Sequence, residues 1–207
     1  MARHAPLDLR ERAAAIAGRP LLPNQVHQFN KYLELLKKWG SVHRLIGSTD
    51  SAWIVENLFL DSLLFLRLLP GTAHSVMDLG AGAGVPGVPI KIARPEIRLT
   101  LVESKQRKVS FLSTVVRELE LTDTRVVNAR AESAPAELLG AFDTVVMRCA
   151  GPSHRLVPFA LRFLRPGGVV IKSASPTPGE RQALNMVRVS GVKAGAQRTF
   201  EVYRHPS

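Results

Sequence analysis

The sequence predicts an α/β fold in which a helical region precedes a parallel β-sheet with alternating helices. In the first seventy or so residues, apolar positions recur at intervals of three and four without a β-branched run, which is typical of amphipathic helices. Further on, short apolar runs alternate with turn residues and amphipathic segments, which is typical of β-α repeats around a parallel sheet. We therefore predict a helical region over residues 1–72 and an α/β domain over residues 73–207.

Length and composition exclude some classes of protein. With 207 residues, 45% of them hydrophobic, the chain can bury a core, which excludes disorder of the whole chain. The formal net charge of +11 favours an anionic partner such as nucleic acid; an anionic membrane surface or a merely well-solvated surface are the alternatives. The longest apolar stretch, Leu58–Leu69, is interrupted by polar residues such as Asp61 and Arg67, so no membrane helix is expected.

The cysteine and histidine content bears on the cellular compartment and on metal binding. The single cysteine, Cys149, cannot form an internal disulfide, and the first residues lack the uninterrupted apolar core of a secretory signal. The six histidines are scattered without the spacing of metal ligands. We expect a cytoplasmic protein, a monomer, without a bound metal.

Two helices are expected in the first part. One begins after Pro23 and is expected to end at Gly40, and a second runs over about Ala52–Leu69, after Asp50 and before Pro70. The apolar positions of the first helix are Val26, Phe29, Leu33, Leu36 and Trp39.

The second part predicts five strand–helix repeats and a closing strand. The strands are expected at Ser75–Leu79, Arg98–Glu103, Arg125–Asn128, Thr144–Arg148 and Val169–Lys172, and the closing strand at Arg198–Tyr203. The helices are expected near Val88–Ala93, Gln106–Leu119, Ala136–Leu139, His154–Leu164 and Gly179–Val187. A turn is expected at Leu164–Gly168, and Val189–Ala196 receives no assignment.

The most informative stretch is the glycine-rich loop Asp78–Gly87, which connects the first predicted strand of the α/β domain to the first predicted helix after it. Glycines there allow a sharp turn and a close approach of the backbone to a ligand. Glu103 ends the next strand, where an acid can accept hydrogen bonds from both hydroxyls of an adenosine ribose. The loop and this acid together predict a site for an adenosine-containing cofactor.

The motif leaves three interpretations open: S-adenosylmethionine, a nicotinamide or flavin dinucleotide, and a turn without a ligand. Gly82–Gly87 also matches the dinucleotide-binding pattern G-x-G-x-x-G. Asp78 favours S-adenosylmethionine, because its carboxylate can face an ammonium group but would repel a pyrophosphate at the following helix. The bulky pair Val85-Pro86 also narrows the room for a pyrophosphate.

Further along, Arg130-Ala131-Glu132 follows the third strand, where backbone groups and an acid could contact the adenine edge; alternatively, Glu132 pairs with a basic neighbour such as Arg130.

In order and spacing, the glycine loop, Glu103 and this segment resemble the Rossmann-like class I S-adenosylmethionine-dependent methyltransferases. The chain resembles one family more closely: the bacterial 16S ribosomal RNA guanine-N7 methyltransferases, also called glucose-inhibited division protein B. The residues that carry this resemblance are Leu60-Asp61-Ser62, Asp78–Ile90, Arg94-Pro95-Glu96, Glu103-Ser104, Lys108–Leu112, Ala131-Glu132, Arg148 and Lys172.

The resemblance implies S-adenosylmethionine as cofactor and 16S ribosomal RNA or the small ribosomal subunit as partner. It also implies cofactor contacts at Gly80, Val85, Ala131-Glu132 and Arg148. Together with the loop residues and the acid after the second strand, the predicted cofactor-binding set is Asp78, Gly80, Gly82, Gly84, Val85, Glu103, Ala131, Glu132 and Arg148.

Four segments depart from the family pattern, so another RNA or a small molecule is the alternative substrate. The family usually has Asn-Leu-Thr, Arg-His, Arg-Ala-Phe and Lys-Gly at these places. This chain has Arg44-Leu45-Ile46, Asn57-Leu58, Arg148-Cys149-Ala150 and Lys172-Ser173.

Methyl transfer depends on positioning, and N7 of guanine has a lone pair and no proton, so no general base is needed. Arg148, at the end of the fourth strand, is predicted to hold the cofactor or the guanine edge; a structural ion pair with Asp78 or Glu103 is the equally weighted alternative. Lys172, at the end of the fifth strand, is predicted to hold a phosphate.

Other side chains receive ordinary interpretations. Cys149 is expected to be a buried residue and not a nucleophile, and Trp39 and Trp53 are expected to pack in the core more than to stack on bases. Several basic residues are candidates to follow an RNA backbone: Lys31, Lys37, Lys38, Arg44, Lys105, Arg107 and Lys108.

Overall fold

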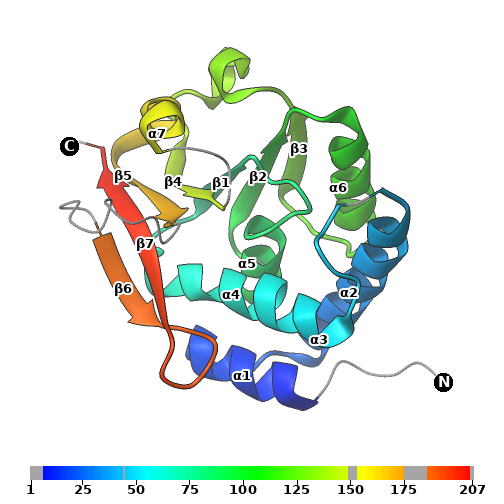
Figure 1. The fold of residues 1–207 in the computed structure, drawn as a ribbon. Helices are drawn as coiled ribbons and strands as arrows, with labels where there is room; N and C mark the ends of the chain where they lie inside the picture. The colour runs from blue at the N-terminus through cyan, green and yellow to red at the C-terminus, as the bar shows by residue number, and fades with distance from the viewer. Residues whose placement is uncertain (1–6, 44, 149–152, 175–185, 206–207) are drawn as a thin grey trace.

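A seven-stranded sheet lies at the centre of the structure, with its strands in the order β3-β2-β1-β4-β5-β7-β6 (Figure 1). The computed structural model describes residues 7–43, 45–148, 153–174 and 186–205. The strands are β1 (Ser75–Leu79), β2 (Arg98–Glu103), β3 (Thr124–Asn128), β4 (Phe142–Met147), β5 (Leu164–Ser173), β6 (Met186–Ser190) and β7 (Gln197–Arg204). The first five strands pair in parallel, and β7 lies antiparallel between β5 and β6.

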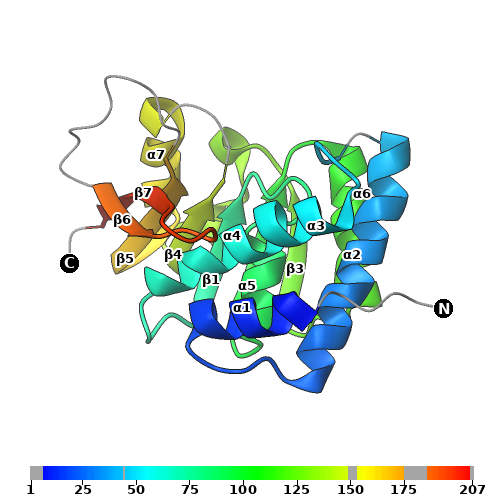
Figure 2. The ribbon, with the colours of Figure 1, turned by 60° about the horizontal axis from the view of Figure 1, so that its bottom comes forward.

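The central strands are buried throughout because helices cover both faces of the sheet (Figure 2). Every residue of β1 and β4 is buried, as expected of parallel strands inside a sheet. The predicted bounds of β1 and β2 are confirmed, and the predicted third, fifth and closing strands are present with longer bounds. The predicted fourth strand, Thr144–Arg148, begins two residues earlier and ends one residue earlier, so Arg148 lies just after it.

Near the carboxyl terminus, the described end of one predicted helix is a strand, and one predicted turn interrupts the pairing of a strand. The predicted helix over Gly179–Val187 overlaps β6, and residues 179–185 of that segment lie outside the described residues. In β6, half-buried and exposed residues alternate along an edge strand, a pattern of period two that a helix does not produce. The expected turn Leu164–Gly168 lies inside β5, where a register shift opposite Phe142 accommodates it.

Helices lie on both faces of the sheet. One face carries the helical region, α5 and α6, and the other carries α7 and two short 3₁₀ turns (Figure 2). The bounds are α1 (Leu7–Ala17), α2 (Pro23–His43), α3 (Ser51–Ile54), the π-helical turn η1 (Val55–Leu60), α4 (Asp61–Leu63), the 3₁₀ turn η2 (Leu64–Arg67), α5 (Gly87–Ala93), α6 (Gln106–Glu118), the 3₁₀ turns η3 (Ala131–Ser133) and η4 (Ala136–Leu138), and α7 (Ser153–Arg162).

The helical region shares a core with the sheet. Phe29 and Tyr32 of α2 lie 5.2 Å, between ring centroids, from Phe59 of η1, and one cluster joins them to buried residues of β1 and β2. Gly40 lies inside α2 and does not end it, so that prediction is wrong. A side chain at this position would crowd Ile46, because a Cβ would lie 3.0 Å from Ile46 Cγ1.

Candidate cofactor and active site

A cavity of about 240 Å³ lies at the carboxyl edge of β1, β2 and β3. Its walls include Gly80 of the glycine loop, Glu103 at the end of β2, and Ala131 and Glu132 of η3. Parallel strands place their carboxyl ends at one edge, so residues from three separate loops meet there. Four of the predicted cofactor residues therefore lie together.

The Glu103 carboxylate lines this cavity and accepts hydrogen bonds from nearby backbone groups. Its Oε2 accepts a hydrogen bond from the Gly82 backbone N–H at 3.0 Å, and its Oε1 accepts one from the Lys105 N–H at 2.8 Å. The side chain is buried, yet it borders the cavity. A carboxylate oxygen can accept more than one hydrogen bond, so Glu103 can fix the loop and accept from a ligand hydroxyl as well.

The glycine loop needs glycine for two different reasons. Gly82 and Gly84 both have positive φ angles, of 59° and 92°, a region that side chains rarely adopt. At Gly82 a Cβ would have space, because its nearest atoms would be 3.8 Å away. At Gly84 a Cβ would lie 2.8 Å from Val88 Cγ2 and 2.9 Å from the Tyr32 hydroxyl oxygen. Of these two glycines, Gly84 is therefore the one required by packing as well as by backbone conformation.

Gly84→Ala is expected to lower the free energy of unfolding by about 3 kcal/mol, because it adds a steric clash to the strain of a positive φ. Gly82→Ala, the matched control, adds the strain alone and is expected to cost about 1 kcal/mol. Urea denaturation of the two variants measures the difference. Equal losses of stability would show that the contacts at Gly84 do not matter.

Tyr32, which the sequence did not single out, holds the loop from the side of α2. Its buried hydroxyl donates a 2.6 Å hydrogen bond to the Ala83 carbonyl, and its ring stacks on Phe59. Burial raises the pKa of this hydroxyl well above its ordinary value, so it stays a neutral donor. A tyrosine within an apolar helical stripe is the signal that could have indicated it, because a buried hydroxyl needs a partner.

Asp78 lies beneath the loop and not on the wall of the cavity. Its buried Oδ2 accepts a 2.8 Å hydrogen bond from the Gly87 N–H, the first residue of α5, while its Oδ1 has no hydrogen-bond partner among the described residues. The carboxylate therefore occupies the position where a dinucleotide pyrophosphate would meet the helix N-terminus. This geometry weighs against the dinucleotide interpretation. Val85 is half-buried, packs against the hydrophobic core and is not among the residues that line this cavity.

Burial is the main reason why the pKa of Asp78 rises to about 7; the Gly87 N–H and the charge of Arg148 lower it, and the charge of Glu103 raises it. The folded protein therefore binds this proton more tightly than the unfolded chain, where an aspartate has a pKa of about 4. The penalty of holding the ionised carboxylate is absent below about pH 4, grows as the pH rises, and is complete above about pH 7.

Asp78→Asn is expected to become more stable relative to the unsubstituted protein as the pH rises from 4 to 8. The full difference corresponds to at most about 4 kcal/mol, from the rise of the pKa to about 7. Urea denaturation across this range measures it. The exposed carboxylate of Glu137 provides the control, because Glu137→Gln should show no such trend. A stability difference that does not change with pH would contradict the prediction for Asp78.

Arg148 lies at the end of β4 and contacts the helical region. Its Nη2 lies 3.3 Å from Asp61 Oδ2, and the same group donates a hydrogen bond to the Asn57 carbonyl. The predicted structural ion pair is thus present, but its partner is Asp61 and not Asp78 or Glu103. The side chain is 14% exposed, and Nη1 is buried without a hydrogen bond among the described residues.

Lys172 has a different environment from the one predicted. Its Nζ lies 3.0 Å from Glu201 Oε1 in an ion pair whose side chains are 6% and 9% exposed. Glu201 also accepts a 2.6 Å hydrogen bond from the Tyr203 hydroxyl. β7 runs antiparallel to β5 and places Glu201 opposite Lys172, so the ammonium is buried and already paired with a carboxylate.

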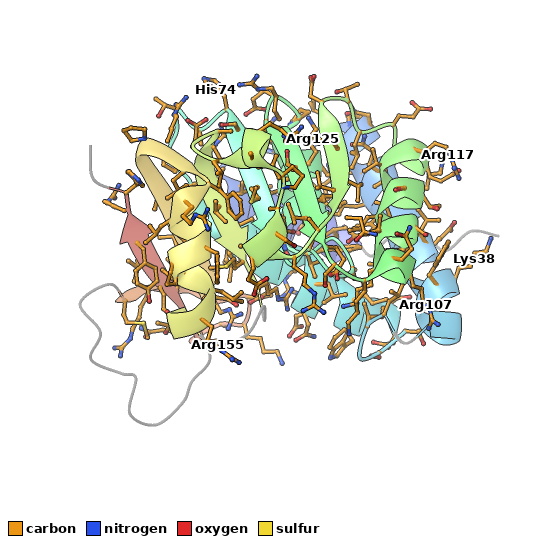
Figure 3. The ribbon with its side chains drawn as sticks, turned by 90° about the horizontal axis from the view of Figure 1, so that it is seen from above. Lys38, His74, Arg107, Arg117, Arg125 and Arg155 are labelled. Carbon is orange, nitrogen blue, oxygen red and sulfur yellow. The ribbon has the colours of Figure 1, made fainter. Side chains whose placement is uncertain are left out.

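Basic side chains lie on both sides of the molecule. Arg107, near the start of α6, and Arg155, near the start of α7, lie at one edge of the molecule, whereas His74 and Arg125 lie at the opposite edge (Figure 3). Among the other candidates for following an RNA backbone, Lys31 forms an ion pair with Glu118 at 3.3 Å, and Lys108 is half-buried. The exposed candidates are Lys37, Lys38 and Lys105. Arg44 and Cys149 lie outside the described residues.

The remaining expectations have structural outcomes. Trp39 and Trp53 pack against the core, as predicted. Within the described residues there is no group of three or more side chains that could hold a metal ion, and no helix is long and apolar enough to cross a membrane. A larger cavity of about 500 Å³ lies at the amino ends of the strands, between residues such as Arg98 and Phe142, and none of the predicted site residues lines it.

Solved structures agree with this architecture. The [4+2]-cyclase SpnF superposes with a TM-score of 0.58 at 17% identity, covering 90% of this chain and 98% of that one. A precorrin-6y C5,15-methyltransferase from Geobacter metallireducens superposes with a TM-score of 0.54 at 15% identity, covering 80% and 92%. At these identities the likeness concerns the fold, which is that of the class I S-adenosylmethionine-dependent methyltransferases.

Sequence relatives are more specific. A protein from Anaeromyxobacter sp. (strain Fw109-5) named ribosomal RNA small subunit methyltransferase G is 34% identical over 200 residues, or 96% of this chain and 91% of that protein. A protein of the same name from Sorangium cellulosum is 38% identical over 169 residues, covering 80% and 70%. The family model described as rRNA small subunit methyltransferase G (GidB) matches residues 25–195. This chain therefore belongs to the rRNA small subunit methyltransferase G family.

Proposed function

We propose that this chain transfers the methyl group of S-adenosylmethionine to N7 of a guanine in 16S ribosomal RNA. Membership of the family makes it an S-adenosylmethionine-dependent methyltransferase of ribosomal RNA. The observation that carries the proposal is the meeting of Gly80, Glu103 and Ala131-Glu132 around one cavity at the carboxyl edge of the sheet. The proposal includes a monomer that acts in the cytoplasm without a metal ion.

The residues around the cavity fit the adenosyl part of this cofactor. Glu103 would accept hydrogen bonds from the ribose hydroxyls, and the segment Ala131-Glu132 would contact the adenine edge. Gly80 has no side chain to fill the space where the loop approaches the ligand. Asp78, whose buried Oδ1 has no hydrogen-bond partner within the described part of the chain, would add negative potential near the cationic methionine end. When bound, S-adenosylmethionine supplies an electrophilic methyl group.

The chain's own contribution to the transfer is positioning. N7 of guanine attacks with a lone pair and loses no proton, so the residues need only to align the base with the methyl group and to exclude water. The described residues that line the cavity include no histidine or lysine to serve as a base, which suits this acceptor. Arg148 would hold the guanine carbonyl edge or the cofactor; in support, its buried Nη1 has no acceptor among the residues that the structure describes.

Two experiments test this function. Isothermal titration should show binding of S-adenosylmethionine and none of NAD; the reverse result would remove the proposed mechanism. Purified protein with S-adenosylmethionine labelled in its methyl group should then label 16S RNA, either naked or in small subunits, isolated from cells that lack the protein. Label in 23S RNA only, or in small molecules only, would contradict the proposed substrate.

A further inference from the structure

A second guanidinium lies beside Arg148 at the carboxyl edge of the sheet. Arg198 of β7 places its Nε 3.1 Å from Asp61 Oδ1 and donates from Nη2 to Asp61 Oδ2 at 3.4 Å. Arg148 Nη2 lies 3.3 Å from the same Oδ2. Asp61 is the first residue of α4, so three segments that are distant in sequence meet at one carboxylate.

This cluster, consisting of Asp61, Arg148 and Arg198, lies beside the glycine loop. Because β7 runs antiparallel to β5, its first residues lie where β5 ends, and the Ala174 N–H donates to the Thr199 carbonyl at 3.1 Å. Arg148 follows the carboxyl end of β4, next in the sheet. The charge of Arg148 also lowers the pKa of Asp78, the carboxyl group beneath the loop. The cluster and the proposed cofactor cavity therefore share one edge of the sheet.

The cluster has more positive charge and more donors than its own carboxylate can satisfy. Two guanidiniums face one carboxylate. Arg198 Nε, although close to Asp61, is not aligned to donate, and Arg148 Nη1 also makes no hydrogen bond within the part of the chain that the structure describes. A purely structural ion pair would not need the second guanidinium. The excess charge and donors suit an additional anionic acceptor.

Arg198 is both held in place and accessible. Its guanidinium lies over the Phe200 ring, 5.8 Å from the centroid, and its side chain remains 24% exposed. The planar guanidinium of arginine can donate two parallel hydrogen bonds to the oxygens of a phosphate group. An RNA substrate has one phosphate group per nucleotide. A phosphate contact also suits the reaction, because a cation directed neither at a phosphate nor at the guanine carbonyl edge would oppose the positive charge of the methylated guanine.

We propose that Arg198 binds a phosphate of the target RNA close to the modified guanine, and that Asp61 is the positioning residue that holds Arg198 and Arg148 side by side. This inference rests on the proposed function. It adds a residue beyond the family match, which ends at residue 195. Asp61 acts through the two arginines and not on the substrate.

The test compares Arg198→Gln with Arg204→Gln, which removes the same charge from the exposed far end of β7, opposite Val169. Arg198→Gln is expected to raise the KM for RNA about tenfold at low salt and to reduce the slope of log KM against log salt concentration by about one. Its kcat and its Kd for S-adenosylmethionine should stay within about twofold, because a phosphate contact contributes equally to ground and transition states. Arg204→Gln should match the unsubstituted protein.

A charge-conserving variant and a variant of Asp61 sharpen the test. Arg198→Lys should keep the slope of log KM against log salt concentration, because lysine keeps the charge. It should raise the KM for RNA, because lysine lacks the planar, two-donor geometry of the guanidinium. Asp61→Asn should lower kcat about tenfold or more, since both arginines lose their anchor. Circular dichroism melts of each variant confirm that the protein is folded under assay conditions.

Two results would overturn the inference. If Arg198→Gln behaves like Arg204→Gln in KM and salt slope, Arg198 only anchors β7. If it raises the Kd for S-adenosylmethionine instead, Arg198 binds the cofactor carboxylate and not RNA. Failure of the unsubstituted protein to methylate 16S RNA would count against the proposed function itself, so the two failures are distinguishable.

Discussion

Replacing Arg148 by alanine is expected to lower kcat/KM for RNA methylation by about 100-fold or more. The guanidinium follows the end of β4, beside β1 and its glycine loop, where the proposed function has the base align with the methyl donor. The fold should survive, because Arg198 still lies 3.1 Å from Asp61 and compensates its charge. Steady-state kinetics with 16S RNA measures the effect, and urea denaturation verifies the fold.

The Kd for S-adenosylmethionine assigns the contact that Arg148→Ala removes. An unchanged Kd means that Arg148 holds the guanine, whereas a raised Kd means that it holds the cofactor. Arg204→Ala serves as the control, since it removes an exposed arginine at the opposite end of β7 from Arg198. Full turnover by Arg148→Ala would show that the ion pair with Asp61 is structural only.

Glu103→Ala is expected to weaken S-adenosylmethionine binding by about 100-fold, or about 3 kcal/mol. The substitution removes the proposed acceptor for the ribose hydroxyls and also releases the Gly82 N–H, which Glu103 holds at 3.0 Å. Glu103→Gln should have an intermediate effect, because the amide oxygen can still accept one hydrogen bond. Isothermal titration measures both affinities.

The control for Glu103 is Glu137→Gln, which neutralises an exposed carboxylate that does not line the cavity. Its affinity for S-adenosylmethionine should equal that of the unsubstituted protein. If Glu103→Ala bound the cofactor equally well, the cavity at the carboxyl edge would not be the cofactor site.

Much of the fold could be predicted because local signals were strong there. β1 and β2 are short runs with several apolar residues between turn signals, and their bounds were predicted correctly. β6 was missed because an edge strand buries only some of its side chains, and its few apolar residues give a weak periodic signal. The end of α2 was misplaced because the packing of Gly40 against Ile46 outweighs the helix-ending tendency of glycine.

The candidate site likewise has one part that could be predicted from the sequence and one part that could not. The glycine loop, Glu103 and Ala131-Glu132 lie next to strand ends, so their meeting follows from the topology of a parallel sheet. Pairings between distant segments do not follow from local sequence. The pairs of Lys172 with Glu201 and of Asp61 with Arg198 depend on where the antiparallel strand β7 inserts, which no local pattern specifies.

The central claim is that this chain methylates N7 of one guanine in 16S RNA. Borohydride reduction followed by aniline cleavage breaks RNA at N7-methylguanine and can be mapped by primer extension. In 16S RNA from a strain lacking this protein, one cleavage site present in the parent strain should be absent, and the purified protein with S-adenosylmethionine should restore it. An identical cleavage pattern in the two strains would contradict the claim.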